Sequence, residues 1–183
     1  EKDGSYVLLL DAGNSIGGSE VGEYDGGRAI AGLMGAVGYD AMVPGVYDFS
    51  GGPSSLTNLR GDMSFPFLAA NVLKSDETCL MEDYLILNIH NVKVGLIGVT
   101  QAMDQETAEK NGLTLTDPVK AVKKAVSQIG GDADMNIVMA CVDEESTLSE
   151  IAGIKGVNLV IDGVKDKYYE ADGAGGAMIV SCG

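Results

Sequence analysis

The sequence predicts an α/β fold with a mixed sheet or sheets, and three observations indicate this class. Short, continuous apolar runs, typical of strands buried on both faces, recur along the chain. Segments with apolar residues at helical spacing lie between several of these runs. One pair of runs is separated by only two residues, which is typical of an antiparallel hairpin. Strands that alternate with helices, with one hairpin among them, favour an α/β architecture.

The first half of the chain begins with a predicted strand at Tyr6–Leu10, whose continuous apolar run indicates burial on both faces. A glycine-rich loop follows through Gly27. Residues 28–37 have apolar side chains at helical spacing, and Gly38 is suited to end that helix. The further elements expected here are a strand at 41–43, which ends at a Pro-Gly pair, a short helix at 54–59 and a buried strand at 67–72.

The second half begins with the hairpin, for which His90-Asn91 joins the runs 85–89 and 92–99. Asp117-Pro118 is typical of an N-cap and a first helical residue, and the helix behind it should end at Gly130. The remaining elements expected are a strand at 135–140, a helix at 146–152 capped by Ser146 or Thr147, a strand at 157–161 and a last strand at 177–180.

Composition is that of an ordinary globular chain, with 45% hydrophobic and 21% charged residues in 183. One domain over 1–183 is expected at this length. The net charge of -15 argues against nucleic acid and anionic membrane surfaces as partners, since both would repel the chain. No apolar run is long enough to span a membrane. Solubility is the simplest reason for so acidic a composition.

The three cysteines, Cys79, Cys141 and Cys182, are widely spaced. No CxxC pair occurs, which excludes a zinc knuckle or a thioredoxin-like motif. One disulfide, for instance between Cys141 and Cys182, is one interpretation, and buried free thiols are the other.

Six segments resemble, in the same order, segments of one family. Residues 8–14 resemble its LLLDAGD strand and turn, and residues 38–52 resemble its GYDAMVPGNHEFDYG loop. The other four segments are 65–72, 92–100, 133–138 and 157–163. The family is that of the calcineurin-like metallophosphoesterases, and within it the 5'-nucleotidase branch. The resemblance covers nearly the whole chain and implies a four-layered α/β/β/α sandwich. The family's DxH motif, normally on the first strand, would precede Glu1, so the N-terminal strand motif is missing from this chain.

The resemblance also implies a reaction, phosphoester hydrolysis by two divalent cations such as Mn, Mg or Zn. The family's bridging Asp corresponds to Asn14, its catalytic His to Tyr47, and the His of its SH motif to Cys141. A neutral amide, a phenol and a thiol replace the groups that this chemistry needs. Carried over residue by residue, the positions of the family's site are Asn14, Val46, Tyr47, Asp48, Cys141, Val164 and Asp166.

These replacements predict a domain that has kept the scaffold and lost the metal ligands and the catalytic residues. Its only histidine, His90, is placed by the hairpin pattern at a turn, where a structural role is favoured. We therefore expect a catalytically inactive module with a binding or structural role, no bound metal and an unidentified protein or small-molecule ligand. Because the family is often exported from bacterial cells, the resemblance implies an extracytoplasmic setting within an exported or surface protein.

Two other hypotheses use the same strand ends. A residual metal-dependent phosphoester hydrolase, acting on nucleotides or other phosphate esters, would place Asn14, Asp48, Cys141 and Asp166 around one metal. A small-ligand binder would use the vacated cleft, with Tyr47 on its wall.

Three further patterns are weaker. Gly13–Ser19 could cradle a phosphate, but it lacks the Lys of a P-loop, and a glycine-rich connection is favoured. The acidic residues from Asp162 to Asp172 miss the EF-hand spacing, so a solvated loop is favoured over a calcium site. Ser146 and Ser181 have no histidine partner for nucleophilic catalysis.

Overall fold

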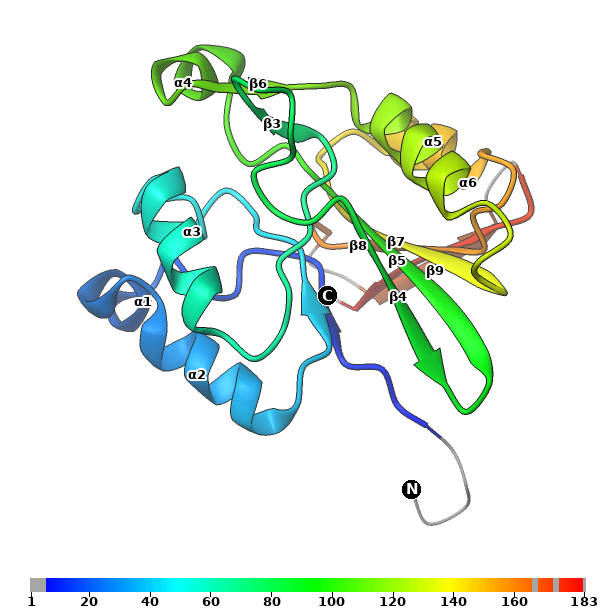
Figure 1. Ribbon diagram of the computed structural model, residues 1–183, viewed down its shortest axis with the longest axis horizontal. Coiled ribbons are helices and arrows are strands. Elements are labelled where there is room, and N and C mark those ends of the chain that lie inside the picture. The colour runs from blue at the N-terminus through cyan, green and yellow to red at the C-terminus, as the bar shows by residue number, and fades with distance from the viewer. Residues whose placement is uncertain (1–5, 166–167, 173–174, 183) are drawn as a thin grey trace.

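The computed structural model describes residues 6–165, 168–172 and 175–182. The described strands form a six-stranded sheet in the order β4-β5-β7-β8-β10-β9, with two-stranded sheets β1-β2 and β3-β6. In chain order the elements are β1 (Leu10–Asp11), α1 (Glu20–Asp25), α2 (Arg28–Val37), β2 (Ala41–Met42), α3 (Pro53–Asp62), β3 (Val72–Lys74), β4 (Tyr84–Ile89), β5 (Val92–Thr100), α4 (Gln105–Lys110), β6 (Leu113–Leu115), α5 (Pro118–Ile129), β7 (Met135–Cys141), α6 (Glu145–Ala152), β8 (Leu159–Asp162), β9 (Tyr168–Asp172) and β10 (Met178–Cys182) (Figure 1).

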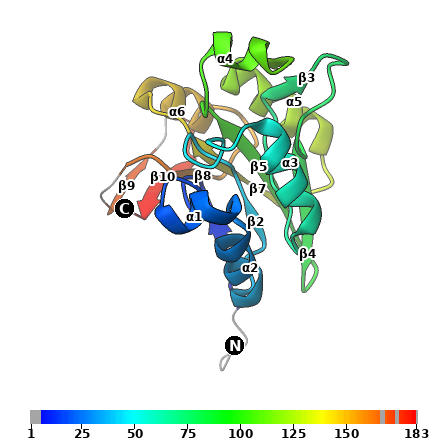
Figure 2. The ribbon, with the colours of Figure 1, turned by 90° about the vertical axis from the view of Figure 1, so that its left-hand side faces the viewer.

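The elements form four layers, as Figures 1 and 2 show from two directions. Helices α2 and α3 pack on the outer face of β2, through Met34, Leu56 and other buried residues. Apolar residues around β1 and β2 face β5 and β7 across a second core cluster. Helices α5 and α6 cover the opposite face of the six-stranded sheet. This is the α/β/β/α sandwich with mixed sheets that the sequence resemblance implies.

Strand direction brings several chain segments to one edge of the sandwich. Strands β5, β7, β8 and β10 are parallel, whereas β4 and β9 pair antiparallel at the two ends of the sheet. Thr100 is paired with Cys141, and Ala140 with Asp162, so these strands end together. β1 and β2 are also parallel, with Asp11 paired to Met42. The loops after these strands therefore lie close to one another.

Several local predictions are confirmed. α2 spans Arg28–Val37 as predicted, and Gly38 ends it in a left-handed conformation with φ 95°. His90 and Asn91 form the hairpin turn, both with positive φ, 47° and 70°. The Asp117 side chain accepts a hydrogen bond from the backbone N–H of Lys120 and caps α5.

The structure corrects the prediction of a buried strand at Tyr6–Leu10. Only Leu10–Asp11 form β1, and Tyr6 and Val7 are 48% and 76% exposed instead of buried. Among the described residues β1 pairs with β2 alone, so this segment has a sheet neighbour on one side only. The Tyr6 hydroxyl instead lies 2.6 Å from Nε2 of His90 at the hairpin turn.

Other differences concern regularity and element ends. Residues 67–72 are buried as expected, but the segment makes isolated bridges, such as Met42 to Phe67, because it crosses between sheets instead of following one neighbour. α6 begins at Glu145 with Glu144 as N-cap and no side-chain capping bond, so Ser146 and Thr147 lie inside the helix. Elements that the sequence pattern did not predict are α1, α4, β6 and β9, and the predicted strand at 67–72 shares only Val72 with β3.

Candidate functional site

A cleft of about 280 Å³ lies at the carboxyl ends of β1, β2, β5, β7 and β8. Each strand is followed directly by a loop that contributes one or two side chains to the cleft. The lining residues are Asn14, Val46, Tyr47, Gln101, Cys141, Asp143 and Val164. Ligand sites in α/β folds occur preferentially at such strand ends, and this cleft is therefore the candidate functional site.

The structure brings together most of the residues that the resemblance selected. Asn14, Val46, Tyr47, Cys141 and Val164 all line the cleft, although they come from three separate loops and the end of β7. Asp48 does not line it, and Asp166 lies outside the described residues.

Asp48 is a buried structural carboxylate, only 7% exposed. Its Oδ2 accepts the backbone N–H groups of Asn14 and Gly45, both at 2.8 Å. Its Oδ1 accepts those of Ile16 at 2.8 Å and Gly17 at 3.0 Å. One side chain from the loop after β2 thus holds the glycine-rich loop after β1 in place. A carboxylate that accepts so many N–H groups has little capacity left for another ligand.

The same contacts decide how the glycine-rich loop is used. The N–H groups of Asn14, Ile16 and Gly17 donate to Asp48, and that of Gly13 donates to Asp11 at 2.9 Å. These donors point at protein carboxylates and are not free to hold a phosphate. The structure therefore supports the interpretation of this loop as a glycine-rich connection.

Cys141 lies at the floor of the cleft and is 3% exposed. Its Sγ accepts a hydrogen bond from Nδ2 of Asn14 at 3.6 Å. Burial, reinforced by surrounding carboxylates of which Asp48 contributes most, raises the pKa of this thiol to about 12. The group is therefore a neutral thiol at pH 7. Cys141 is a free cysteine, which excludes its suggested disulfide with Cys182.

Asp11, at the end of β1, is also engaged within its own turn. Its carboxylate accepts the N–H of Gly13 and the hydroxyl of Ser15. Burial is the largest influence on this carboxyl and raises its pKa, and the nearby charge of Asp48 acts in the same direction.

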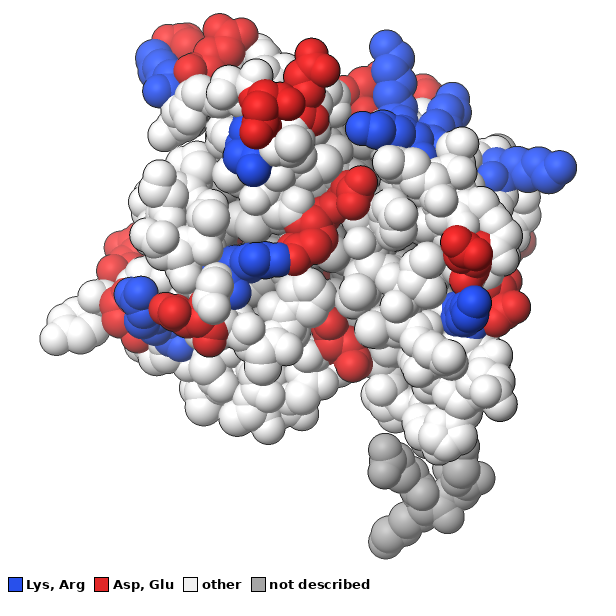
Figure 3. All heavy atoms as spheres, viewed as in Figure 1, with Lys and Arg blue, Asp and Glu red and all other residues white. Residues whose placement is uncertain are grey.

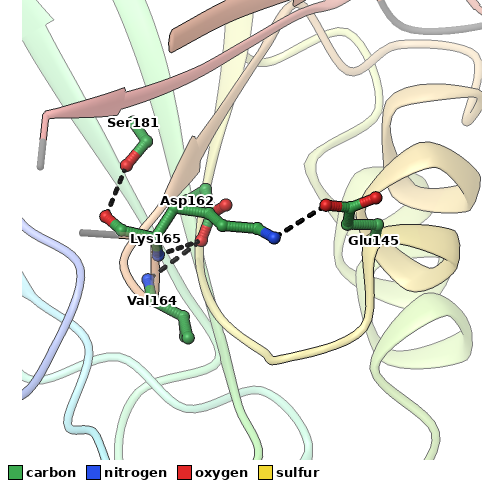
Figure 4. A network of polar contacts seen from close by, with 5 residues as sticks. All are labelled: Glu145, Asp162, Val164, Lys165 and Ser181. Carbon is green, nitrogen blue, oxygen red and sulfur yellow. Dashed lines mark hydrogen bonds and ion pairs between the residues drawn. The ribbon is translucent and has the colours of Figure 1, made fainter. Parts of the chain in front are cut away.

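The loop after β8 is held by a network drawn in Figure 4. Oδ1 of Asp162 accepts the N–H of Val164 at 2.9 Å, which sets the position of Val164 on the cleft wall. Nζ of Lys165 lies 2.7 Å from Oε1 of Glu145 on α6 (Figure 4). The hydroxyl of Ser181 donates to the carbonyl of Lys165 at 2.9 Å. The ammonium group of Lys165 is thereby paired with α6, while its neighbour Val164 lines the cleft.

Gln101 and Asp143 are cleft residues that the sequence reasoning missed. Gln101 follows the last residue of β5, and Asp143 lies two residues beyond β7. The backbone N–H of Asp143 donates to Oε1 of Gln101 at 3.1 Å, and the Gln101 N–H donates to the carbonyl of Cys141 at 2.9 Å. The available signal was their position just after predicted buried strands.

The residues present do not fit the two divalent cations that the family resemblance implies. Within the described part of the chain, no three His, Cys, Asp or Glu side chains come together in a way that could hold a metal ion. Asp48 is occupied by backbone N–H groups, and Cys141 is a neutral thiol with an amide donor. Val46 and Val164 offer no lone pair at all. We derive no chemical step through a metal at this cleft.

Comparisons with known proteins agree with one another. The chain is 29% identical to bovine (Bos taurus) 5'-nucleotidase over 172 residues, which are 89% of this chain and 30% of the relative. Calcineurin-like phosphoesterase YfkN from Bacillus subtilis superposes with a TM-score of 0.80 at 23% identity, covering 95% of this chain and 66% of that one. The sulfate thiohydrolase SoxB of Thermus thermophilus gives 0.81 at 19% identity, covering 98% and 34%. No protein-family model matches the chain.

The fold is therefore that of the calcineurin-like phosphoesterases. Together with the sequence relatives named 5'-nucleotidase, these solved structures show that the chain has a 5'-nucleotidase-family metallophosphoesterase fold. The chain spans 17% of the length of the snake venom 5'-nucleotidase of Gloydius brevicauda and 30% of the length of the bovine enzyme. It therefore corresponds to only part of these relatives. Among the described residues, no helix is long and apolar enough to cross a membrane.

Proposed function

We propose that this chain is a catalytically inactive module of the 5'-nucleotidase family whose cleft binds a small ligand. The observation that supports this most directly is the pairing of Asn14 with the thiol of Cys141 at the cleft floor. By the family resemblance, these two positions would supply a bridging carboxylate and an imidazole. Here an amide and a neutral thiol satisfy each other instead, while the cleft around them persists.

We also propose an extracytoplasmic setting, as part of an exported or surface protein. The family resemblance supports this, and so do relatives described as snake venom 5'-nucleotidases, one of which is 36% identical over 102 residues. The partner is a small molecule in this proposal, and the net charge of -15 argues against nucleic acid. On the face shown in Figure 3, basic side chains lie among acidic ones, with large uncharged areas between them.

The test of inactivity is a hydrolysis assay with purified protein, Mn²⁺, and either a nucleoside monophosphate or p-nitrophenyl phosphate. We expect no turnover above that of a double variant, Asn14→Ala with Cys141→Ala, purified in the same way. Turnover that disappears with chelator, survives repurification and is lost in the double variant would overturn the proposal.

The names of the sequence relatives favour the alternative of a residual metal-dependent phosphoester hydrolase. It would use Asn14, Asp48, Cys141 and Asp166 around one metal. It predicts that Mn²⁺ raises the melting temperature, and that Asn14→Ala with Asp166→Ala abolishes this increase. No change in melting temperature with metal would count against it.

A further inference from the structure

The charge of the cleft differs from that of a phosphate site. Among its described lining residues Asp143 is the one charged side chain, and none is Lys, Arg or His. Asp11, Asp48 and Asp162 lie close enough behind the lining to act electrostatically on Cys141 together with Asp143. Lys165 directly follows the cleft residue Val164, and its ammonium group is paired with Glu145 on α6. A ligand in this cleft therefore meets carboxylates without an offsetting cation among the described residues.

The remaining walls of the cleft are apolar, aromatic or amide-bearing. Val46 and Tyr47 are 51% and 58% exposed, so both present surface to an incoming ligand. Val164 contributes a further aliphatic wall, and Gln101 is held by its bond from the Asp143 N–H. An exposed phenol ring that lines the same cleft as a carboxylate suits a cation with an apolar body, since the ring face attracts positive charge.

Size restricts the ligand as well. A cleft of about 280 Å³ is slightly smaller than the usual range for ligand sites, about 300–1,000 Å³. A phosphate ester placed here would bring its negative charge close to Asp143, and the interaction would be repulsive. An ammonium group at the same place would be attracted.

We infer that this cleft selects a small organic cation, an amine with an aromatic or aliphatic body, with Asp143 as counter-ion and Tyr47 as aromatic wall. This inference rests on the proposed ligand-binding function and names the chemical class of the ligand. Gln101, whose Oε1 accepts the Asp143 N–H, supplies its amide NH2 group for a polar substituent on the same ligand.

The experiment titrates the whole chain with three benzyl or phenyl probes of different charge. Binding of each probe is measured by NMR from the changes in backbone amide chemical shifts. The probes are benzylamine, which is cationic at pH 7, neutral benzyl alcohol and anionic phenyl phosphate. We expect saturable shifts at Tyr47, Gln101 and Asp143 with benzylamine. Benzyl alcohol should bind at least fivefold more weakly, and phenyl phosphate should give no saturable shift.

Variants assign the binding to the cleft. Asp143→Asn and Tyr47→Leu should each raise the Kd for benzylamine at least threefold. Their matched controls are Asp132→Asn, an exposed aspartate beyond α5, and Tyr24→Leu, a tyrosine of α1 that is 94% exposed. Both controls should leave the Kd unchanged.

Four outcomes would overturn the inference: no benzylamine binding, equal affinity for benzyl alcohol, no effect of Asp143→Asn, or saturation by Mg²⁺ alone at the same residues. Tyr47-dependent binding of benzyl alcohol without hydrolysis of phenyl phosphate would leave the proposed binding function standing and remove only the charge preference. Hydrolysis of phenyl phosphate at this cleft would instead remove the proposed function itself.

Discussion

The carboxylate of Asp48 accepts the backbone N–H of Asn14 at 2.8 Å. This bond joins the loop after β2 to the loop after β1, across 34 positions of sequence. It places the Asn14 amide where its Nδ2 reaches Cys141 and its Oδ1 accepts the N–H of Tyr47 at 3.2 Å. The cleft is thus organised by a buried carboxylate that does not itself line it.

Replacing Asp48 should destabilise the fold strongly. Asp48→Ala leaves buried N–H groups without their acceptor, and we expect the free energy of unfolding to fall by about 3 kcal/mol or more. Asp48→Asn keeps one acceptor oxygen and should cost less. Urea denaturation measures both, with the exposed Asp143→Asn as control, expected within about 0.5 kcal/mol of the parent chain. A loss for Asp48→Ala as small as that of the control would contradict this role.

A second prediction follows from the close packing of the glycine-rich loop against the backbone at Tyr47. A Cβ on Gly17 would lie 1.9 Å from the carbonyl oxygen of Tyr47, so Gly17→Ala must displace backbone. We expect a loss of about 2 kcal/mol or more. Gly32, in the interior of α2 with open space around it, is the matched control. Gly32→Ala should stabilise the chain by about 0.5–1 kcal/mol, since Ala favours helix over Gly. Equal effects of the two substitutions would show that the loop tolerates displacement.

Thiol reactivity tests the state of Cys141. Because thiolate is the reactive form, a buried thiol with a pKa of about 12 should react with iodoacetamide at pH 8 at least tenfold more slowly than Cys79. Burial also raises the pKa of Cys79, but that residue is half-exposed. A Cys182→Ser background leaves two thiols to follow by mass spectrometry. In urea the two rates should become similar, and similar rates in the native chain would refute the prediction.

The pKa of Asp11 predicts a direction for stability against pH. Its folded-state pKa is raised above the ordinary value of 3.8, chiefly by burial. The folded chain therefore holds this proton more tightly, and the associated stability, present below 3.8, is lost as pH rises through the folded pKa. Relative to Asp11→Asn, the parent chain should thus lose free energy of unfolding as pH rises above 3.8 and through the folded-state pKa.

Asp104 is the control with the opposite sign. Its hydrogen bond from the Thr107 N–H lowers its pKa, so its contribution is present above 3.8 and lost as pH falls through the folded pKa. Urea denaturation across the pH range should give opposite slopes for Asp11→Asn and Asp104→Asn when each is subtracted from the parent chain. Slopes of the same sign would contradict the assignment for Asp11.

Local patterns were sufficient for much of the fold. The hairpin at His90-Asn91, the helix at 28–37 and the cap at Asp117 depend on residues within a few positions of each other, and all were predictable. The strand at 6–10 was not, because burial of a strand depends on neighbours distant in sequence. β1 has one such neighbour among the described residues, and Tyr6 and Val7 are exposed beside it.

Some residues of the candidate site were predictable from the sequence, and others were found only in the structure. Asn14, Val46, Tyr47, Cys141 and Val164 were identified through motif resemblance, and the structure gathers them in one cleft. The spacing of residues in the sequence did not indicate that the Asp48 side chain is buried under the loop after β1. Nor did it indicate that Gln101 and Asp143 line the same cleft.

By itself, the sequence determined the hairpin, several of the helices and strands, the family resemblance and which residue stands at each family site position, because these depend on residue identity and local periodicity. Only the tertiary structure decided which carboxylate faces the cleft and which is buried under a loop. Asp48 and Asp143 have the same side chain, and both follow buried strands. Their roles differ because backbone N–H groups from a distant loop surround one, while the other lines an open cleft.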